Sequence, residues 1–427
     1  MKQTEIDGVA DTLIPDDWEV KSLGEVATIV GGGTPSTLNS AYWNGDIQWF
    51  TPAELSNSKK YVSKSERTIT ERGLKESSAK LLPKGTVLLT TRASIGITAI
   101  LENPASTNQG FQSLIAKNNC CSEFLYYVIP LIKDEMLSRA SGSTFAEISA
   151  KKLSTITFQL PPLPEQQRIA KALSDVDALI STTEKLIQKK KNIKQGAMQN
   201  LLTGKKRLPG FGPQTKSPAY KQTELGPVPD DWEVKEFGDY ASIVRGGSPR
   251  PIQNFLTTNS DGINWIKIGD VKPEDKYIVS TEEKIIREGK THSREVHKGD
   301  FILSNSMSFG RPYILQIDGC IHDGWLAIQN YQDTFDTDFL YYLLGSDEIF
   351  KQYIEMAAGS SVQNLNKEKV AKLLVPIFDK KEQTAIASVL SSMDKEIENL
   401  NTKLEKYRNL KTAMMQQLLT GKIRLVK

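Results

Sequence analysis

Two short loops combine glycine and proline with groups that donate hydrogen bonds: GTPS at residues 33–36 and GSPR at residues 247–250. Glycine lets a ligand approach the backbone, and the neighbouring amides and hydroxyls suit phosphate oxygens. A plain turn uses the same glycine and proline, so binding and turn formation explain these loops equally well. The candidate contacts here are Thr34, Ser36, Arg245, Ser248 and Arg250.

A second polar set pairs TTRASIGITA (residues 90–99) with SNSMSFGRPY (304–313), and TNQGF (107–111) with IHDGW (321–325). Amide, guanidinium and carboxylate side chains of this kind make paired hydrogen bonds to the edges of nucleic-acid bases. The glycines are kept while the polar residues change, as two readers of different sequences require, although drift after a duplication leaves a similar trace. The candidates are Arg92, Ser94, Asn108, Gln109, Asn305, Ser306, Arg311 and Asp323.

A third polar set, SGSTFAEISAKKL and AGSSVQNLNKEKV, comes shortly before each of two long helical patterns. These side chains suit backbone phosphates, but hydroxyl and amide groups at such places also cap helices, and capping is the favoured explanation. The candidates are Ser143, Thr144, Lys151, Ser361, Gln363, Asn364 and Lys367.

Signatures of catalysis are missing from the chain. The segment EGKTH lacks the earlier glycine of a phosphate-binding loop, because Lys284 stands there. The only Pro-Pro, at residues 161–162, is flanked by leucines and does not resemble the motif with which amino-methyltransferases hold a base. The three histidines fit no zinc motif, and two Glu-x-Lys pairs are too common on charged surfaces to indicate a nuclease. We therefore expect no catalytic residues, metal or cofactor on this chain.

The chain is an internal duplication. PDDWEVK occurs at residues 15–21 and at 229–235, which places Trp18 and Trp232 214 positions apart. The same offset relates the glycines of the polar loops, and an offset of 217 then relates EQ (Glu165, Glu382) and LLTGK (Leu201, Leu418). Each half therefore contains a globular domain followed by a long helix, and the architecture predicts a pseudo-two-fold axis.

The two helical patterns have the spacing of a coiled coil, with apolar residues every three or four positions. Thr183 and Lys190 interrupt the first seam, while Ile193 and Leu410 continue the two seams at equivalent positions. Gly204 and Gly421 follow LLT and suit left-handed helix caps. The residues predicted to pair the helices are Ile169, Leu173, Val176, Ile180, Ile187, Leu201, Ile386, Leu390, Met393, Ile397, Leu400, Leu404 and Leu418.

Helix length decides the predicted architecture. A helix over residues 164–203 extends about 60 Å, which exceeds the diameter of a domain of this size. Most of the helix therefore needs a packing partner outside its own domain, and the long helix of the other half is the obvious one. The fold class is α+β: two mixed α/β domains separated by two antiparallel helices, with short strand-like runs such as TVLLTT and DFILS. We expect a first domain at 1–163, a first helix at 164–207, a linker at 208–222, a second domain at 223–380 and a second helix at 381–427.

Composition describes an ordinary folded protein. The 427 residues include 54 basic and 51 acidic side chains, a net charge of +3 that suits a nucleic acid without arguing for one. Three cysteines without a metal or disulfide pattern favour a reducing cytoplasm. The amino terminus lacks a signal-peptide pattern and no apolar run is long enough to span a membrane, so we expect a cytoplasmic protein.

Together, PDDWEVKSLGE, GGGTPS, LPPLPEQQRIAKAL and the closing LLTGK resemble the DNA-specificity subunit of type I restriction-modification enzymes, over essentially the full chain. The resemblance implies a non-catalytic subunit with two target recognition domains, each recognising one half of a gapped, asymmetric site on double-stranded DNA. It further implies that the helices set the gap and dock two modification subunits that bind S-adenosylmethionine. Motor-nuclease subunits using ATP and Mg²⁺ could join them. The second boundary, LLVPIFDKKEQ, departs from the pattern because it lacks Pro-Pro-Leu-Pro.

The predicted geometry is compatible with that function. Domains at opposite ends of a spacer of about 50 to 60 Å would centre on half-sites about 10 to 15 base pairs apart. Two other functions stay open. A coiled-coil scaffold that binds only protein would explain the helices but not the diverged polar loops. A self-contained methyltransferase-nuclease would need the motifs that are missing.

Overall fold

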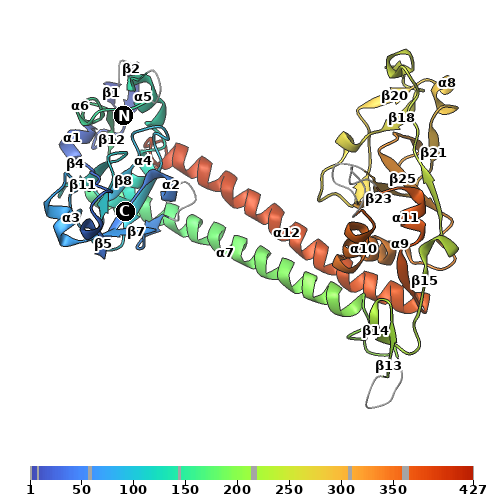
Figure 1. Cartoon of the computed structure of the whole chain (residues 1–427). Coiled ribbons are helices and arrows are strands. Elements are labelled where there is room, and N and C mark those ends of the chain that lie inside the picture. Colours follow the sequence, from blue (N-terminus) through green and yellow to red (C-terminus); the bar gives the residue numbers. More distant parts are fainter. Residues whose placement is uncertain are drawn as a thin grey trace. The chain divides into compact units, whose positions relative to one another are not determined.

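The computed structural model describes residues 2–6, 9–55, 60–142, 146–212, 219–305, 310–357 and 365–426. The chain divides into two compact units. Unit 1 contains residues 1–184 and 403–427, so both chain ends marked in Figure 1 belong to it, and unit 2 contains residues 185–402. In the described part of the chain, no helix has the length and apolar character needed to cross a membrane.

Unit 1 is built mainly of short strands and short helices before its first long helix. In chain order these are β1 (Lys2–Ile6), β2 (Val9–Ile14), β3 (Glu19–Ser22), α1 (Leu23–Val26), β4 (Ala27–Gly31), η1 (Ser40–Tyr42), β5 (Trp43–Phe50), α2 (Pro52–Leu55), β6 (Tyr61–Val62), β7 (Arg67–Ile69), α3 (Glu71–Lys75), β8 (Val87–Leu89), β9 (Thr98–Leu101), β10 (Ser106–Thr107), β11 (Gln112–Ala116), α4 (Ser122–Val128), α5 (Lys133–Arg139), α6 (Ala150–Ser154), β12 (Thr157–Leu160) and α7 (Leu163–Leu201).

Unit 2 repeats this order and ends in the second long helix. Its elements are β13 (Tyr220–Thr223), β14 (Gly226–Pro229), β15 (Glu233–Glu236), η2 (Phe237–Asp239), β16 (Ser242–Arg245), η3 (Ile252–Asn254), β17 (Leu256–Thr257), β18 (Ile263–Ile266), η4 (Ile268–Asp270), β19 (Tyr277–Ile278), β20 (Glu283–Ile285), α8 (Arg287–Lys290), β21 (Arg294–Val296), β22 (Phe301–Ser304), β23 (Pro312–Leu315), β24 (Gly319–Ile321), β25 (Trp325–Gln329), α9 (Thr337–Leu344), α10 (Asp347–Ala357), α11 (Lys367–Ala371), β26 (Leu374–Ile377) and α12 (Lys380–Leu418).

The duplication extends to the strand order of the main sheet. In unit 1 the order is β4-β11-β8-β9-β6, and in unit 2 it is β16-β25-β22-β23-β19. Each sheet is antiparallel except at one edge, where β6 pairs parallel to β9 and β19 parallel to β23. The central strands β8 and β22 form within the strand-like runs TVLLTT and DFILS, and both are buried throughout. The mixed α/β fold of both halves is confirmed.

A smaller sheet in each unit carries the polar loops at its strand ends. Its common strands are β10-β5-β7 in unit 1 and β24-β18-β20 in unit 2, and unit 2 adds β17 and β21 at the edges. The pairs β10–β5 and β24–β18 are parallel. The segments TNQGF and IHDGW begin at the last residues of β10 and β24, so the two sets occupy the same place in the two sheets.

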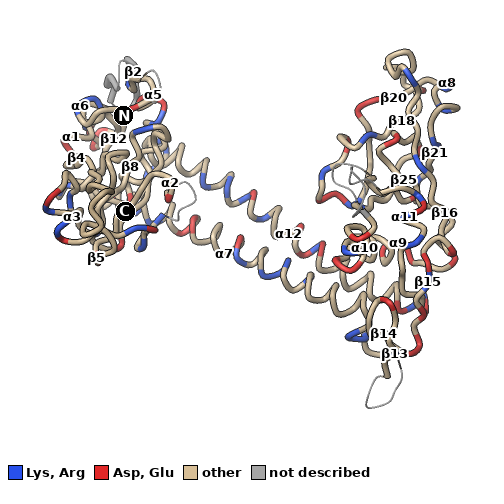
Figure 2. The backbone as a smooth tube through the Cα atoms, in the orientation of Figure 1, with Lys and Arg blue, Asp and Glu red and all other residues tan. Residues whose placement is uncertain are grey.

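The boundary between the units falls within both long helices, which are 39 residues each. Within unit 1, Lys411 pairs with Asp177 at 2.6 Å and Arg408 with Glu184 at 2.9 Å, so this part of α12 runs antiparallel to this part of α7. Within unit 2 the same holds, because Lys190 pairs with Glu396 at 2.7 Å and Lys194 with Asp394 at 2.5 Å. Basic and acidic residues are interspersed along both helices (Figure 2).

The two interruptions of the first seam have separate structural explanations. Thr183 is buried, and its hydroxyl donates to the Leu179 carbonyl oxygen at 2.7 Å, so the polar group is satisfied within the helix. Lys190 forms the ion pair with Glu396.

Ile193 and Leu410 are each 46% exposed. Of the predicted pairing residues, Ile180, Met393 and Leu400 are half-buried, and the others are buried: Ile169, Leu173, Val176, Ile187, Leu201, Ile386, Leu390, Ile397, Leu404 and Leu418.

Each unit contains an arginine clasp, which joins the arginine after the end of one helix to the first-turn glutamate of the other helix. In unit 1 the Arg424 guanidinium donates to both carboxylate oxygens of Glu165 at 2.9 and 2.8 Å, and to Asp17 at 2.7 Å. The Trp18 indole also donates to Glu165, at 3.0 Å. Burial alone would raise the pKa of Glu165, but these donors outweigh it and hold that pKa below its ordinary value.

In unit 2 the clasp is formed by the equivalent residues. Arg207 and Glu382 are 217 positions from Arg424 and Glu165, and Asp231 is 214 positions from Asp17. Arg207 donates to Glu382 at 2.5 and 2.6 Å and to Asp231 at 2.8 and 3.0 Å. Burial would lower the pKa of Arg207, but its two carboxylate partners raise it above its ordinary value. The Glu382 side chain is 2% exposed, so Arg207 takes the place of water as the partner of its carboxylate.

The helix caps explain why LLTGK and PDDWEVK recur together. Gly204 and Gly421 have φ of +69° and +68°, as predicted for left-handed caps. A Cβ on Gly421 would lie 2.7 Å from Pro15 Cγ, and one on Gly204 would lie 2.5 Å from Pro229 Cδ. The proline of each PDDWEVK copy therefore requires a glycine at the cap that packs against it.

The first strand of unit 2 begins within the stretch predicted as a linker. Strand β13 begins at Tyr220, inside the stretch 208–222, and pairs with β14 in an antiparallel hairpin. The Tyr220 hydroxyl donates to the carbonyl oxygens of Gly204 and Lys205 at 3.3 and 3.2 Å, which ties the strand to the helix cap. Residues 213–218 of that stretch lie outside the described residues.

Replacing the clasp arginine of unit 2 tests its contribution. Arg207→Gln leaves a buried carboxylate without its cation, so we expect the free energy of opening of the first turns of α12 to fall by about 3 kcal/mol. Native-state hydrogen exchange of the amides in residues 382–392 measures this. The matched control is Arg408→Gln, which removes a pair whose side chains are 50% and 47% exposed and should cost under about 1 kcal/mol. Equal losses in the two variants would contradict the assignment.

Candidate nucleic-acid interface

In unit 2, the GSPR loop follows β16 and packs against the segment that follows β24. The Gly246 amide donates to the Trp325 carbonyl at 2.9 Å, and the Gly247 amide to the Ile321 carbonyl at 3.1 Å. A Cβ on Gly246 would lie 2.1 Å from the His322 carbonyl oxygen, so the close approach requires glycine. The two segments are thereby fixed to each other by their backbones.

Side chains from both segments converge on Asp323. The Ser248 hydroxyl donates to its Oδ1 at 3.0 Å, and the Arg250 guanidinium lies 3.2 Å from its Oδ2. His322 Nε2 lies 3.0 Å from Oδ1. We call these four residues the Asp323 cluster. The Arg250 side chain is 80% exposed whereas that of Asp323 is 28% exposed, so the cluster presents its guanidinium outward.

Asn305 and Arg245 hold the backbone of this cluster. The Asn305 side-chain amide donates to the Asp323 carbonyl at 3.0 Å, and Arg245 Nε donates to the same oxygen at 3.3 Å. Asn305 is only 5% exposed, so its amide supports the loop from within. Arg245 itself is exposed.

Burial would raise the pKa of Asp323, but the Ser248 hydroxyl and the neighbouring His322, Arg250 and Arg245 outweigh it and hold that pKa below 3.8, its ordinary value. A group with a lowered folded pKa contributes its stability above the ordinary value and loses it as the pH falls through the folded pKa. The Asp323 carboxylate therefore keeps its charge throughout the neutral range.

The Asp323 cluster borders an open hollow of about 750 Å³. Trp265 of β18 and Lys267, which follows this strand, line it together with the GSPR loop, and Glu283 pairs with Lys267 at 2.9 Å. The sequence prediction missed His322 as a member of this site, although it included Asn108 at the equivalent position. The constant offset between TNQGF and IHDGW is the signal that would have identified it.

Unit 1 has the same frame with different side chains. The Thr34 hydroxyl hydrogen-bonds the Gln109 side-chain oxygen, as Ser248 bonds Asp323 in unit 2. Asn108 Oδ1 accepts from the Gly110 amide at 2.9 Å, and His322 Nδ1 accepts from the Gly324 amide at the same distance. A Cβ on Gly32 would lie 2.0 Å from the Asn108 carbonyl oxygen, which repeats the close approach at Gly246.

Three further candidates in unit 1 are exposed. Arg92 lies 3.7 Å from Glu147, and its side chain is 47% exposed. Ser94 is exposed two residues later, after Ala93, which has φ of +62°. Ser36 is exposed, and its carbonyl accepts from the Trp43 indole at 3.1 Å. These residues present polar groups to solvent without forming one cluster with Gln109.

The caps of the short helices α6 and α11 come from residues that the prediction did not name. Ser149 accepts from the Lys152 amide at 3.3 Å, and Asn366 accepts from the Lys369 amide at 2.8 Å. Lys151 and Lys367 are exposed within these helices. The candidates that lie outside the described residues are Ser143, Thr144, Ser306, Ser361, Gln363 and Asn364.

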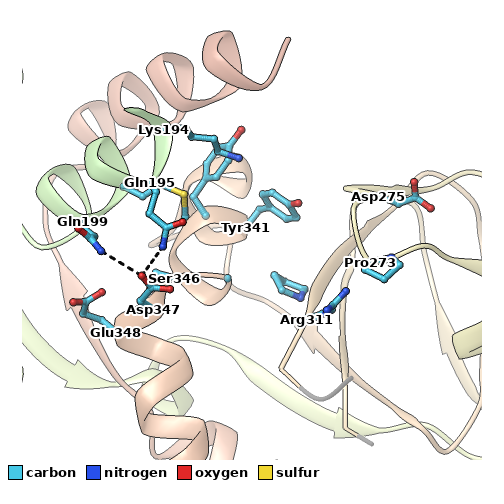
Figure 3. Close-up of a pocket in the computed structure, with 14 residues that line it drawn as sticks. Lys194, Gln195, Gln199, Pro273, Asp275, Arg311, Tyr341, Ser346, Asp347 and Glu348 are labelled. Atoms are coloured by element: carbon cyan, nitrogen blue, oxygen red, sulfur yellow. Dashed lines mark hydrogen bonds between the residues drawn. The ribbon is translucent and has the colours of Figure 1, made fainter. Parts of the chain in front are cut away.

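Arg311 lines a different hollow, of about 290 Å³, shown in Figure 3. Gln195 and Gln199 of α7 donate to Asp347 at 2.8 and 3.4 Å, beside Glu348 and Ser346. Asp275 also lines this hollow, so three carboxylates face two cations, Lys194 and Arg311. Such a lining is a poor site for phosphate, and Arg311 is separate from the Asp323 cluster.

Comparison with known proteins assigns the family. The family model described as the type I restriction modification DNA specificity domain matches residues 15–194 and again residues 229–406. The chain belongs to the type I restriction-modification DNA specificity family. The two matches coincide with the two halves of the duplication. No group of His, Cys, Asp and Glu in the described part of the chain has the arrangement of a metal site.

Similar proteins include three specificity subunits. The MjaIX type I restriction enzyme specificity subunit of Methanocaldococcus jannaschii is 39% identical over 58% of this chain and 56% of its own length. The MjaX subunit of the same organism, described as putative, is 28% identical over 96% of this chain and 95% of its own. The EcoR124I/EcoR124II specificity subunit of Escherichia coli is 33% identical over 38% of this chain and 42% of its own.

Solved structures share the fold at low sequence identity. A chain from a study of complex assembly and conformational transition of a type I R-M system has a TM-score of 0.59 and 16% identity, covering 96% of this chain and all of that one. The type I restriction-modification S subunit from M. genitalium has a TM-score of 0.58 and 14% identity, covering 96% and 97%. This chain therefore shares its fold with these two solved chains.

Neutralising Asp323 should loosen the GSPR loop. Asp323→Asn removes the charge that Ser248, Arg250 and His322 share, so we expect hydrogen exchange at the Asp323 amide, which donates to Ser248 at 3.3 Å, to accelerate about tenfold or more at pH 7. Asp261→Asn, in an exposed turn of the same unit, is the control and should change nothing there. Unchanged exchange in Asp323→Asn would show that the cluster does not hold the loop.

Proposed function

We propose that this chain is the non-catalytic DNA-recognition subunit of a type I restriction-modification complex, in which each domain recognises one half of a gapped, asymmetric site on double-stranded DNA. The observation that carries the proposal is the pair of equivalent loops. The backbone frame is the same at Gly32 and Gly246, but the side chains at the next polar positions differ. Two recognition sites with one frame and different donors and acceptors suit two different half-sites.

The long helices are proposed to set the gap between the half-sites and to dock two modification subunits. Each helix has 39 residues, about 58 Å at 1.5 Å per residue. Buried apolar residues recur along both, and ion pairs such as Lys190–Glu396 fix their register. The exposed Leu179, Leu186, Ile193 and Leu410 offer apolar contacts on these helices for partner subunits.

In this proposal the chemistry belongs to the partners. The chain carries no phosphate loop or base-holding methyltransferase motif in its sequence. Modification subunits would bind S-adenosylmethionine and methylate adenine. Motor-nuclease subunits, where present, would use ATP and Mg²⁺. Methylation or cleavage of DNA by the purified chain alone would contradict this division.

Exchange of the first domain tests the assignment of half-sites. We expect a chain in which residues 1–163 come from another specificity subunit, expressed with the modification subunit, to methylate a gapped site with one new half and one unchanged half. Genome-wide mapping of methylated adenines measures this. The control is the parent chain in the same host. A parent chain that gives no gapped motif with its modification subunit would favour the scaffold instead.

Lengthening both helices tests their role as a ruler. Insertion of seven residues after Glu184 and seven after Thr402 keeps the apolar spacing and adds about 10 Å. We expect the gap between the half-sites to lengthen by about 3 base pairs while both half-site sequences stay the same. Insertion into α7 alone is the control, because it breaks the pairing and should reduce methylation at every site. An unchanged gap after the paired insertion would contradict the ruler.

A further inference from the structure

Residues 109 and 323 occupy the same place in the two units but differ in chemistry. Each follows the parallel strand of the smaller sheet by two positions, and each receives a hydrogen bond from the hydroxyl of the GTP or GSP loop. The neighbouring backbone is fixed by the Gly110 and Gly324 amides in the same way. Because the backbone around residues 109 and 323 is held in the same way, an exchange of side chain at this position can change the group on the ligand that is bound while the loop keeps its conformation.

In unit 2 both oxygens of the Asp323 carboxylate already have partners within the protein. Its Oδ1 faces Ser248 and His322 at 3.0 Å each, and its Oδ2 faces Arg250 at 3.2 Å. Most of its acceptor positions are therefore taken before a cytosine amino group could approach. The carboxylate instead orients the guanidinium of Arg250, which is 80% exposed and engages it through NH2. An arginine held in this way is suited to the O6 and N7 acceptors of guanine.

In unit 1 the corresponding group is the carboxamide of Gln109. Thr34 occupies one position on its oxygen, and an amide oxygen has a second lone pair while the amide nitrogen has two protons. The exposed Gln109 therefore retains one acceptor and two donors in an orientation fixed by Thr34. That pattern suits the N6 donor and N7 acceptor of adenine. Ser36, at the position equivalent to Arg250, is too short to compete for the same base.

We infer that residues 109 and 323 mark the base-recognition position of the two units, where Gln109 selects adenine in one half-site and Arg250, oriented by Asp323, selects guanine in the other. Arg250 and Gln109 contact the base, whereas Asp323 is a positioning residue. The inference rests on the proposed function and adds to it the bases that each domain takes at this position.

The alternative roles have a different signature. An arginine that contacts only phosphate adds affinity for every sequence, so its loss weakens binding uniformly and leaves the motif unchanged. A residue that only supports the loop would loosen several positions of one half-site together. A base contact affects one base pair of one half-site.

The experiment uses the full chain with its modification subunit and maps methylated adenines in a host genome. We expect Arg250→Gln to lower the preference for guanine at one position of one half-site by about tenfold or more, and Gln109→Ala to lower a preference for adenine at one position of the other half-site by a similar factor. Arg287→Gln is the charge-matched control, because Arg287 is an exposed arginine of unit 2 on α8. It should leave the motif unchanged.

A variant that methylates nowhere is examined as the purified complex on four duplexes that differ only at the base pair in question. If the parent complex prefers guanine and the variant complex binds the four duplexes with similar affinities, the inference is supported. A retained guanine preference in Arg250→Gln, or a change spread over both half-sites, would overturn it. If the parent complex itself methylates no gapped motif, the proposed function fails instead, so the two failures are distinguishable.

Discussion

A buried carboxylate stands in the first turn of each long helix, and an arginine neutralises it there. Glu165 and Glu382 are both 1% exposed, and Arg424 and Arg207 bind them with two hydrogen bonds each. Each arginine follows the end of the other helix, so the beginning of one helix and the end of the other are brought to one place. The aspartate before the tryptophan of PDDWEVK joins the same group.

This arginine clasp fixes the globular part of each unit to a pair of antiparallel helix segments. A second polar contact adds to it: the Tyr127 hydroxyl donates to Asp177 at 2.6 Å, and the Tyr342 hydroxyl donates to Asp394 at 2.7 Å. Lys411 and Lys194 complete these contacts from the facing helix. The cores of the units are continuous with the helices, since Phe124 packs in one cluster with Ile169 and Leu173, and Phe339 in one with Ile386 and Leu390. A firmly held frame lets the loop residues diverge without loss of the fold.

Duplication and helical periodicity made much of the architecture predictable from the sequence. The helices, their glycine caps and the equivalence of the two halves follow from repeated letters and apolar spacing, because these are local or internal comparisons. The strand order did not follow, since β6–β9 and β19–β23 pair residues far apart in the chain. The arginine clasp was also missed, although Arg207 and Arg424 stand 217 positions apart as Glu165 and Glu382 do. An ion pair between distant residues leaves no spacing signal of its own.

The candidate site was predictable as a set of positions but not as a mechanism. The equivalence of Gln109 and Asp323 was visible in the sequence, whereas the contacts of Asp323 with Ser248, His322 and Arg250 depend on the three-dimensional fold. For the same reason Asn305, a side chain of the type that contacts bases, proves to be a buried support of the loop. Residue type alone does not separate a group that contacts a ligand from one that holds its neighbour.

The most direct test of a common frame with exchangeable side chains is a graft between the units. The substitutions S36R, N108H and Q109D give unit 1 the polar set of unit 2, with Thr34 supplying the hydroxyl. Mapping of methylated adenines in cells that express the grafted chain with its modification subunit reports both half-sites at once. The account predicts that the half-site recognised by unit 1 changes from adenine to guanine at one position while the other half-site and the gap stay the same. Full methylation of the original motif by the grafted chain would contradict it.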